Sequence, residues 1–130
     1  MIKEIVIDGN NFSTLSEFYE EAEKKLTRGL DWKIGRNLNA FNDVLRGGFG
    51  VHQFGGPLKI KWINSDKSKK DLGWAETVKY IREQLTNCHP SNIPSIKKDL
   101  KKAENKKGEI LFDIIVGIIR SHEHVELKME

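Results

Sequence analysis

One short stretch of the chain, WKIGRNLNAFNDVLRGGFG at residues 32–50, alternates apolar and polar residues at helical spacing. The polar side of this predicted helix carries Asn39, Asn42, Asp43 and Arg46. General acid–base catalysis needs paired or tuned titratable groups, and this stripe holds a single carboxylate. On composition alone the stripe is a solvated helix face, and a docking surface for a partner is the alternative.

The histidines and the single cysteine are the other residues with catalytic or metal-binding chemistry. Cys88 and His89 are adjacent, but adjacency does not aim the ring at the sulfur, and Pro90 indicates a loop. His122 and His124 form an H-x-H pair, yet a closed zinc site needs two further ligands that the spacing does not supply. We therefore expect no catalytic residue, no metal and no cofactor, and hence no enzyme.

Two segments have the composition of anion-binding sites. The loop at 47–56 is rich in glycine, but it lacks a G-K-[ST] ending and precedes a predicted strand rather than a helix. Six lysines between 97 and 107 would attract nucleic acid, but no aromatic residue lies among them to stack bases. We favour a turn and a lysine-rich, solvated insertion at about 88–107 over direct nucleic-acid binding. A nucleic-acid-binding or adaptor module in the basic middle of the chain remains the alternative function.

Three strands are predicted from runs of β-forming residues, at 2–8 (IKEIVID), 58–64 (LKIKWIN) and 124–129 (HVELKM). Helical spacing predicts helices between them, at 13–26, 37–46, 74–85 and 109–120. The segment 65–73 has room for a short helix, and 96–109 is either an exposed helix or a flexible insertion. The order is β-α-α-β-α-α-β. Strands joined by helical crossovers run parallel. This predicts a single α/β domain, a three-stranded parallel sheet packed by about four helices.

Capping residues mark the starts of the first two helices. Thr14 with Glu17 three residues later predicts a capping box, with Ser13 as the rival cap. Asn37 is the predicted N-cap of the helix at 37–46, and Gly47 its C-cap. The positions of the polar stripe should therefore be well defined.

Length and composition describe a soluble globular chain. It has 130 residues, of which 38% are hydrophobic and 32% charged, with a net charge of +3. The most apolar run, at 110–119, is too short to cross a bilayer and contains Asp113. The N-terminal segment reads as a strand rather than a signal peptide, and the single cysteine excludes an internal disulfide. We expect a cytoplasmic protein that does not bind membranes.

The order of elements and the motif GRNLNAFNDVLRGG resemble the barstar family, which are intracellular protein inhibitors of small microbial ribonucleases. The matching residues are Gly35, Asn37, Leu38, Ala40, Asp43, Leu45 and Gly47. The segments IDG, KWINS and GEILFDIIVGIIRSHEHVEL resemble the longer bacterial branch of that family. The resemblance covers about residues 1–75 and 108–130.

The resemblance implies a function for the polar stripe. Members of the family insert the second helix and the loop before it into the active site of the ribonuclease, where an acidic side chain takes the place of a substrate phosphate. Asp43 matches that carboxylate. The implied partner is a small ribonuclease or a related toxin, with no small-molecule substrate, so the protein would act as an inhibitor, antitoxin or immunity protein. The implied partner-binding residues are Gly35, Asn37, Leu38, Asn39, Asn42, Asp43, Arg46 and Gly47.

The chain departs from the family pattern at several positions around this helix. Asn39 stands in place of a second acidic residue, and Asn42 in place of a tryptophan in the best-known member. Lys33 and Ile34 stand where the inhibitors carry aromatic residues. These differences bear on which enzyme is recognised more than on the fold.

Overall fold

The computed structural model describes residues 3–26, 37–45 and 57–130. Strands β1 (Lys3–Asp8), β2 (Leu58–Ile63) and β3 (Val125–Met129) form one parallel sheet in the order β1-β2-β3. In its register Ile5 pairs with Ile60, and Ile60 with Leu127. The predicted parallel sheet is therefore confirmed, with strand ends within one residue of those expected.

The helices between the strands are more numerous than the sequence predicted. Within the described residues they are α1 (Leu15–Leu26), α2 (Leu38–Leu45), α3 (Ser65–Asp71), α4 (Trp74–Asn87), α5 (Ile93–Glu104) and α6 (Leu111–Arg120), with 3-10 turns at Gly9–Asn11 and Pro90–Asn92. The four expected helices are present, and the two segments for which a helix was left open also form helices, α3 and α5. The helix α3 contains no apolar residue and is held by tertiary bonds, and α5 contains four lysines among its twelve residues.

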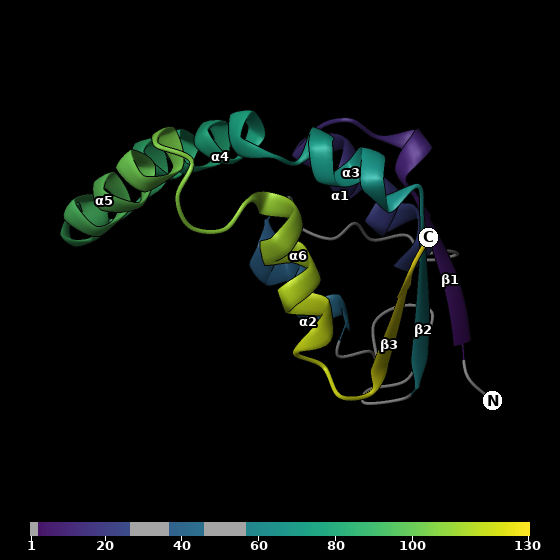
Figure 1. Cartoon of the computed structure of the whole chain (residues 1–130). Helices are drawn as coiled ribbons and strands as arrows, with labels where there is room; N and C mark the ends of the chain where they lie inside the picture. The colour runs from purple at the N-terminus through teal and green to yellow at the C-terminus, as the bar shows by residue number, and fades with distance from the viewer. Residues whose placement is uncertain (1–2, 27–36, 46–56) are drawn as a thin grey trace.

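The core lies between the sheet and helices α1, α2 and α6, which Figure 1 shows beside it. Trp62 of β2 is fully buried and stacks on Phe18 of α1, with ring centroids 5.6 Å apart. Phe18 in turn meets Phe41 of α2 edge to face at 5.3 Å. This aromatic chain couples the sheet to α1 and α1 to α2, so α2 is held by burial as well as by its own hydrogen bonds.

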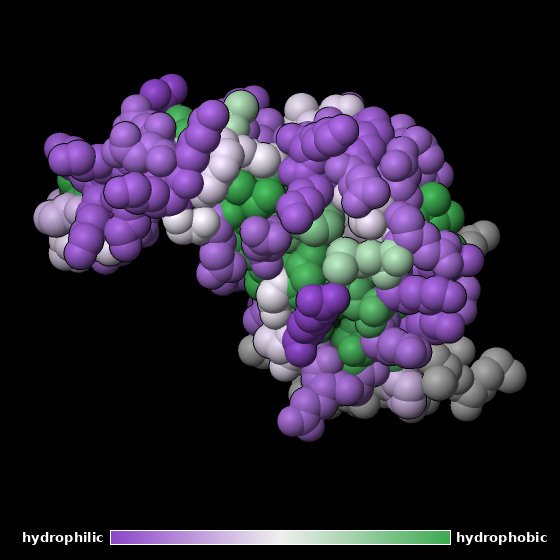
Figure 2. All heavy atoms as spheres, in the orientation of Figure 1, coloured by the Kyte–Doolittle hydropathy of each residue, from purple (hydrophilic) through white to green (hydrophobic). Residues whose placement is uncertain are grey.

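The helices α4 and α5 pack on each other and form an arm that extends away from the sheet (Figure 1). Its surface is largely hydrophilic (Figure 2). Residues 88–107 thus contain the turn at Pro90–Asn92 and helix α5, and all six of the lysines at 97–107 are exposed. None of the helices in the described part of the chain has the length and apolar character needed to cross a membrane.

Candidate partner-binding surface

The polar stripe predicted from the sequence lies on α2. Of the eight residues predicted to bind a partner, the structure describes Asn37, Leu38, Asn39, Asn42 and Asp43. The other three predicted members lie outside the described residues: Gly35, Arg46 and Gly47. The glycine-rich loop at 47–56 lies outside them too.

The start of α2 is capped as predicted. The Asn37 side-chain oxygen accepts a hydrogen bond of 2.7 Å from the amide of Ala40, and the Asn37 carbonyl accepts one of 3.2 Å from Phe41. This satisfies an amide that would otherwise lack a partner in the first turn. Because the Asn37 side chain is used by the helix itself, its contribution to any partner surface is chiefly to fix where α2 begins.

One side of α2 is buried and the other is exposed. Phe41, Val44 and Leu45 are at most 2% exposed, whereas the side chains of Asn39 and Asp43 lie on the exposed face. Asn39 and Asp43 are four residues apart and therefore neighbours on the helix surface. The helix thus presents an amide and a carboxylate from a rigid support.

Two histidines far along the chain hold the C-terminal half of α2. His122 Nε2 lies 2.7 Å from the Asn42 side-chain oxygen, and His124 Nε2 lies 2.8 Å from the carbonyl oxygen of Leu45. The two rings meet edge to face at 5.5 Å. The Asn42 side chain is half-buried and forms a hydrogen bond within the molecule. Its position on the polar stripe did not indicate this internal hydrogen bond.

No local pattern in the sequence indicates that this histidine pair supports α2. The H-x-H spacing suggested only polar residues at a helix-to-strand junction, or two ligands of a metal site. His122 and Asn42 are 80 residues apart, and their contact depends on α6 and β3 returning beside α2. In the described ranges, no three His, Cys, Asp or Glu side chains gather where they could hold a metal ion.

The other candidate pair, Cys88 and His89, does not form a nucleophile and base. The His89 ring lies 2.8 Å from the Ser91 hydroxyl and accepts a hydrogen bond from the Ser91 amide, which caps the turn at Pro90–Asn92. Cys88 Sγ instead lies 3.7 Å from the carbonyl oxygen of Leu85. The arrangement is a helix end followed by a capped turn.

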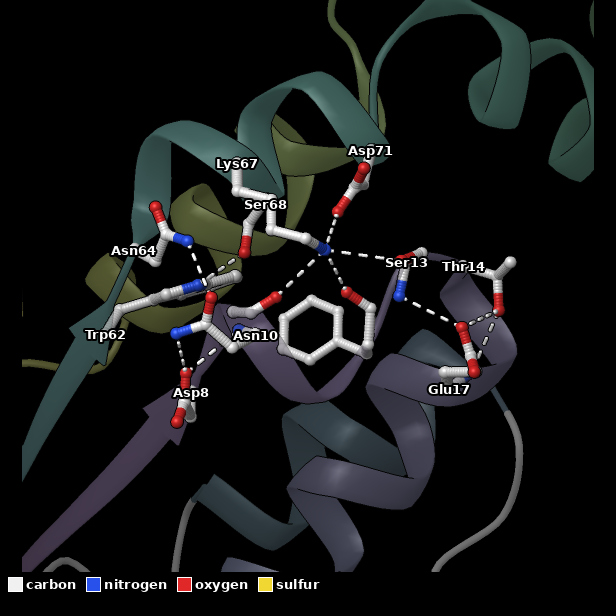
Figure 3. A network of polar contacts seen from close by, with 12 residues as sticks. Asp8, Asn10, Ser13, Thr14, Glu17, Trp62, Asn64, Lys67, Ser68 and Asp71 are labelled. Carbon is white, nitrogen blue, oxygen red and sulfur yellow. Dashed lines mark hydrogen bonds and ion pairs between the residues drawn. The ribbon is translucent and has the colours of Figure 1, made fainter.

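A polar network closes the carboxyl end of the sheet (Figure 3), a place where α/β proteins often bind ligands. The Lys67 ammonium donates to the carbonyl oxygens of Gly9 and Phe12, at 3.2 and 2.9 Å, and to the Ser13 hydroxyl at 3.2 Å. It also pairs with Asp71 at 2.5 Å. Because its donors are engaged in this way, Lys67 has a structural role: it links α3 to the segment that follows β1.

The same figure shows the predicted capping box at the start of α1. The Thr14 hydroxyl accepts from the Glu17 amide at 3.2 Å, so Thr14 is the N-cap. The Glu17 carboxylate accepts from the Ser13 amide at 3.0 Å. The capping prediction is confirmed, with the return bond made one residue earlier than in the standard box.

A groove runs beside the first turn of α2, between that turn, α1 and α4. Its volume is about 370 Å³. The lining residues come from all three helices: Leu15, Tyr19, Asn37, Leu38, Asn39, Tyr80, Glu83, Gln84 and Asn87. The position of α4 beside the polar stripe could not be predicted from the sequence, because the resemblance carried little information on residues 76–107.

Comparison with known proteins agrees with this arrangement of sheet and helices. A search of curated proteins gives no significant match. A family model described as "Barstar (barnase inhibitor)" matches residues 2–94. That match includes β1, α1, α2, β2, α3 and α4. Because it spans more than half of the chain, the protein belongs to the Barstar family, whose members are inhibitors of ribonucleases rather than enzymes.

Proposed function

We propose that this protein inhibits a small, barnase-type ribonuclease by placing α2 in the active site of the enzyme, with Asp43 in the position of a substrate phosphate. The observation that carries the proposal is the contrast between the two sides of α2. Phe41 and Leu45 are fully buried, whereas Asp43 is exposed on the opposite side. A carboxylate on a rigid helix loses little conformational entropy on docking, and it forms strong charge-assisted hydrogen bonds with cationic side chains.

The neighbouring residues divide into supporting and contacting groups in this proposal. Asn37 and Asn42 fix the helix through their bonds to Ala40 and His122. Leu38 and Asn39 are the described residues that extend the contact surface around Asp43. The remaining contacts of the proposed surface fall to Gly35, Arg46 and Gly47, which flank α2 in the sequence.

The charge of the chain is unevenly distributed. The whole chain has a net charge of +3, but residues 97–107 contain six lysines and two acidic residues. The rest of the chain therefore carries a net charge of −1. The six lysines lie on α5 or just after it. Helix α5 is part of the arm and lies away from α2 (Figure 1). These six lysines therefore do not oppose the approach of a cationic active site to α2, whereas residues 32–64, which contain α2, carry a net charge of +4.

The same occlusion would make the protein an antitoxin or immunity protein if the ribonuclease is a toxin. We place its action in the bacterial cytoplasm, because that is where cellular RNA would need protection from such an enzyme. Both statements extend the proposal and depend on the identity of the partner.

The test measures cleavage of RNA by purified barnase with increasing amounts of the inhibitor. We expect the wild type to inhibit, and Asp43→Ala to weaken binding by about 2 kcal/mol or more, the size usual for a central charge in measured interfaces, those of this family included. Asp99→Ala, which removes an exposed carboxylate from α5, is the matched control and should inhibit like the wild type. Failure of the wild type to inhibit, or equal inhibition by Asp43→Ala, would overturn the proposal.

A second candidate function rests on the exposed lysines of α5. Six of them lie within residues 97–107, so the arm has the charge to bind RNA or DNA without sequence preference. Binding of this kind weakens steeply with salt. Salt-sensitive binding of RNA by the wild type, lost when Lys97, Lys98, Lys101 and Lys102 are changed to glutamine, would favour it over ribonuclease inhibition.

A further inference from the structure

Strand β3 forms one edge of the sheet. It pairs with β2 on one side, and no strand of the described residues pairs with its other side. The carbonyl oxygen of His124 accepts a hydrogen bond of 3.0 Å from the amide of Leu58. Alternate residues of a parallel strand bond the same neighbour, so the even-numbered residues of β3 bond β2. The backbone N–H and C=O groups of Leu127 and Met129 therefore point to the open edge.

The apolar side chains of β3 become more exposed along the strand. Val125, Leu127 and Met129 lie on the helix-covered face, because each pairs with a buried residue of β2. Val125 is 9% exposed, Leu127 is half-buried and Met129 is 38% exposed. Among the described residues, Met129 is the one large hydrophobic side chain that is exposed. Figure 2 shows hydrophobic side chains gathered where Figure 1 places α6 and β3. This edge of the sheet thus carries apolar surface that the rest of the chain leaves uncovered.

The sequence of β3 is complementary to itself when two copies run antiparallel. Glu126 and Lys128 flank Leu127, are exposed, and lie on the face of the sheet opposite the helices. With Leu127 of one copy opposite Leu127 of the other, Glu126 of each copy lies opposite Lys128 of the other. On the helix-covered face, Val125 of each copy lies opposite Met129 of the other. Opposite charges and apolar side chains are therefore matched at every position of the pair.

The backbone selects the same register. In an antiparallel pair, opposite residues alternately exchange two hydrogen bonds or none. The N–H and C=O groups of Leu127 both point to the open edge, so the two Leu127 residues can exchange both bonds. A shift by one residue would place Leu127 opposite Glu126, whose backbone groups already bond β2. A shift by two would place Glu126 opposite Glu126, or Lys128 opposite Lys128, and like charges directly opposite are destabilising.

We propose that two copies of this chain pair antiparallel through β3, about a two-fold axis at Leu127, and join their three-stranded sheets into one. The inference does not rest on the proposed function, because it uses no residue of α2. Pairing would remove the apolar surface of Leu127 and Met129 from water and satisfy the backbone groups at the edge. Because the contact is isologous, each favourable pair occurs twice and the assembly closes as a dimer at this edge.

The test measures self-association of the full chain by sedimentation equilibrium. We expect the wild type to be dimeric at about 100 μM, above the micromolar Kd of modest interfaces. Lys128→Glu and Glu126→Lys each place like charges opposite one another twice, so each should weaken the dimer about tenfold. The double variant that carries both changes should associate like the wild type, because the charges are only exchanged. Lys98→Glu, the same change at an exposed position on α5, is the matched control and should leave the dimer intact.

Amide exchange followed by NMR provides a second measurement. The amides of Leu127 and Met129 should exchange quickly in the diluted monomer and slowly in the dimer. A wild type that stays monomeric would overturn the inference, and the edge of β3 would then be open to a strand of a different protein. Equal association of Lys128→Glu and Lys98→Glu would also overturn it, as would a dimer in which these two amides gain no protection. Either result would show that the copies meet at another surface.

Discussion

His124 donates a hydrogen bond of 2.8 Å from Nε2 to the carbonyl oxygen of Leu45, the last residue of α2. The carbonyl can only accept, so the Nε2 atom carries the proton. A carbonyl in the last turn of a helix has no partner within that helix. The residue just before β3 therefore supports the end of the helix that carries Asp43.

Replacement of His124 should loosen α2 rather than unfold the protein. We expect His124→Ala to lower the free energy of unfolding by about 1 kcal/mol, the usual value of one hydrogen bond, and to speed amide exchange in α2. Hydrogen exchange followed by mass spectrometry would measure the local effect. His89→Ala serves as the control, because its exposed ring forms its hydrogen bonds with Ser91 in the turn at Pro90–Asn92. Equal exchange in α2 for both variants would show that the bond to Leu45 does not support the helix.

Phe41 should be essential for the fold and not only for binding. Its ring is fully buried and packs edge to face against Phe18 at 5.3 Å. We expect Phe41→Ala to lower the free energy of unfolding by about 3–5 kcal/mol, because it removes buried apolar surface and leaves a cavity. Chemical denaturation would measure this. Asn39→Ala, on the exposed side of the same helix, should change stability by less than about 0.5 kcal/mol.

Stability should fall at alkaline pH. The chain has two tyrosines, and burial raises the pKa of both above the ordinary value of 10.0. Above pH 10 the unfolded chain therefore holds fewer protons than the folded one. The stabilisation is fully present below pH 10 and is lost as the pH rises towards the folded-state pKa. For the buried Tyr19 the slope approaches about 1.4 kcal/mol per pH unit.

Urea unfolding at several pH values between about 9 and 11 would measure this slope, since that range brackets the ordinary tyrosine pKa. Tyr19→Phe removes the titrating hydroxyl but keeps the ring in the core, so its stability should depend less on pH across the same range. A slope as steep in Tyr19→Phe as in the wild type would contradict the assignment to Tyr19.

Features that depend on nearby residues could be predicted from the sequence. The capping bonds of Thr14 and Asn37 join atoms three residues apart, so the residue types and their spacing were sufficient. The burial of Phe41 and the exposure of Asp43 followed from helical periodicity. Local pattern did not decide whether the segment 65–73 forms the short helix α3. The stability of α3 comes from distant partners, since Lys67 donates hydrogen bonds to the carbonyl oxygens of Gly9 and Phe12.

The sequence by itself determined the order of the elements, the parallel sheet, the family resemblance and the carboxylate at Asp43, because all of these follow from local pattern. Only the tertiary structure decided what stands around that carboxylate. His122 and His124 reach α2 across about eighty residues, and Glu83 of α4 lies in the groove beside Asn39. Such contacts depend on how the helices pack on the sheet. Packing is set by the combined burial of many side chains, which no single segment of the sequence encodes.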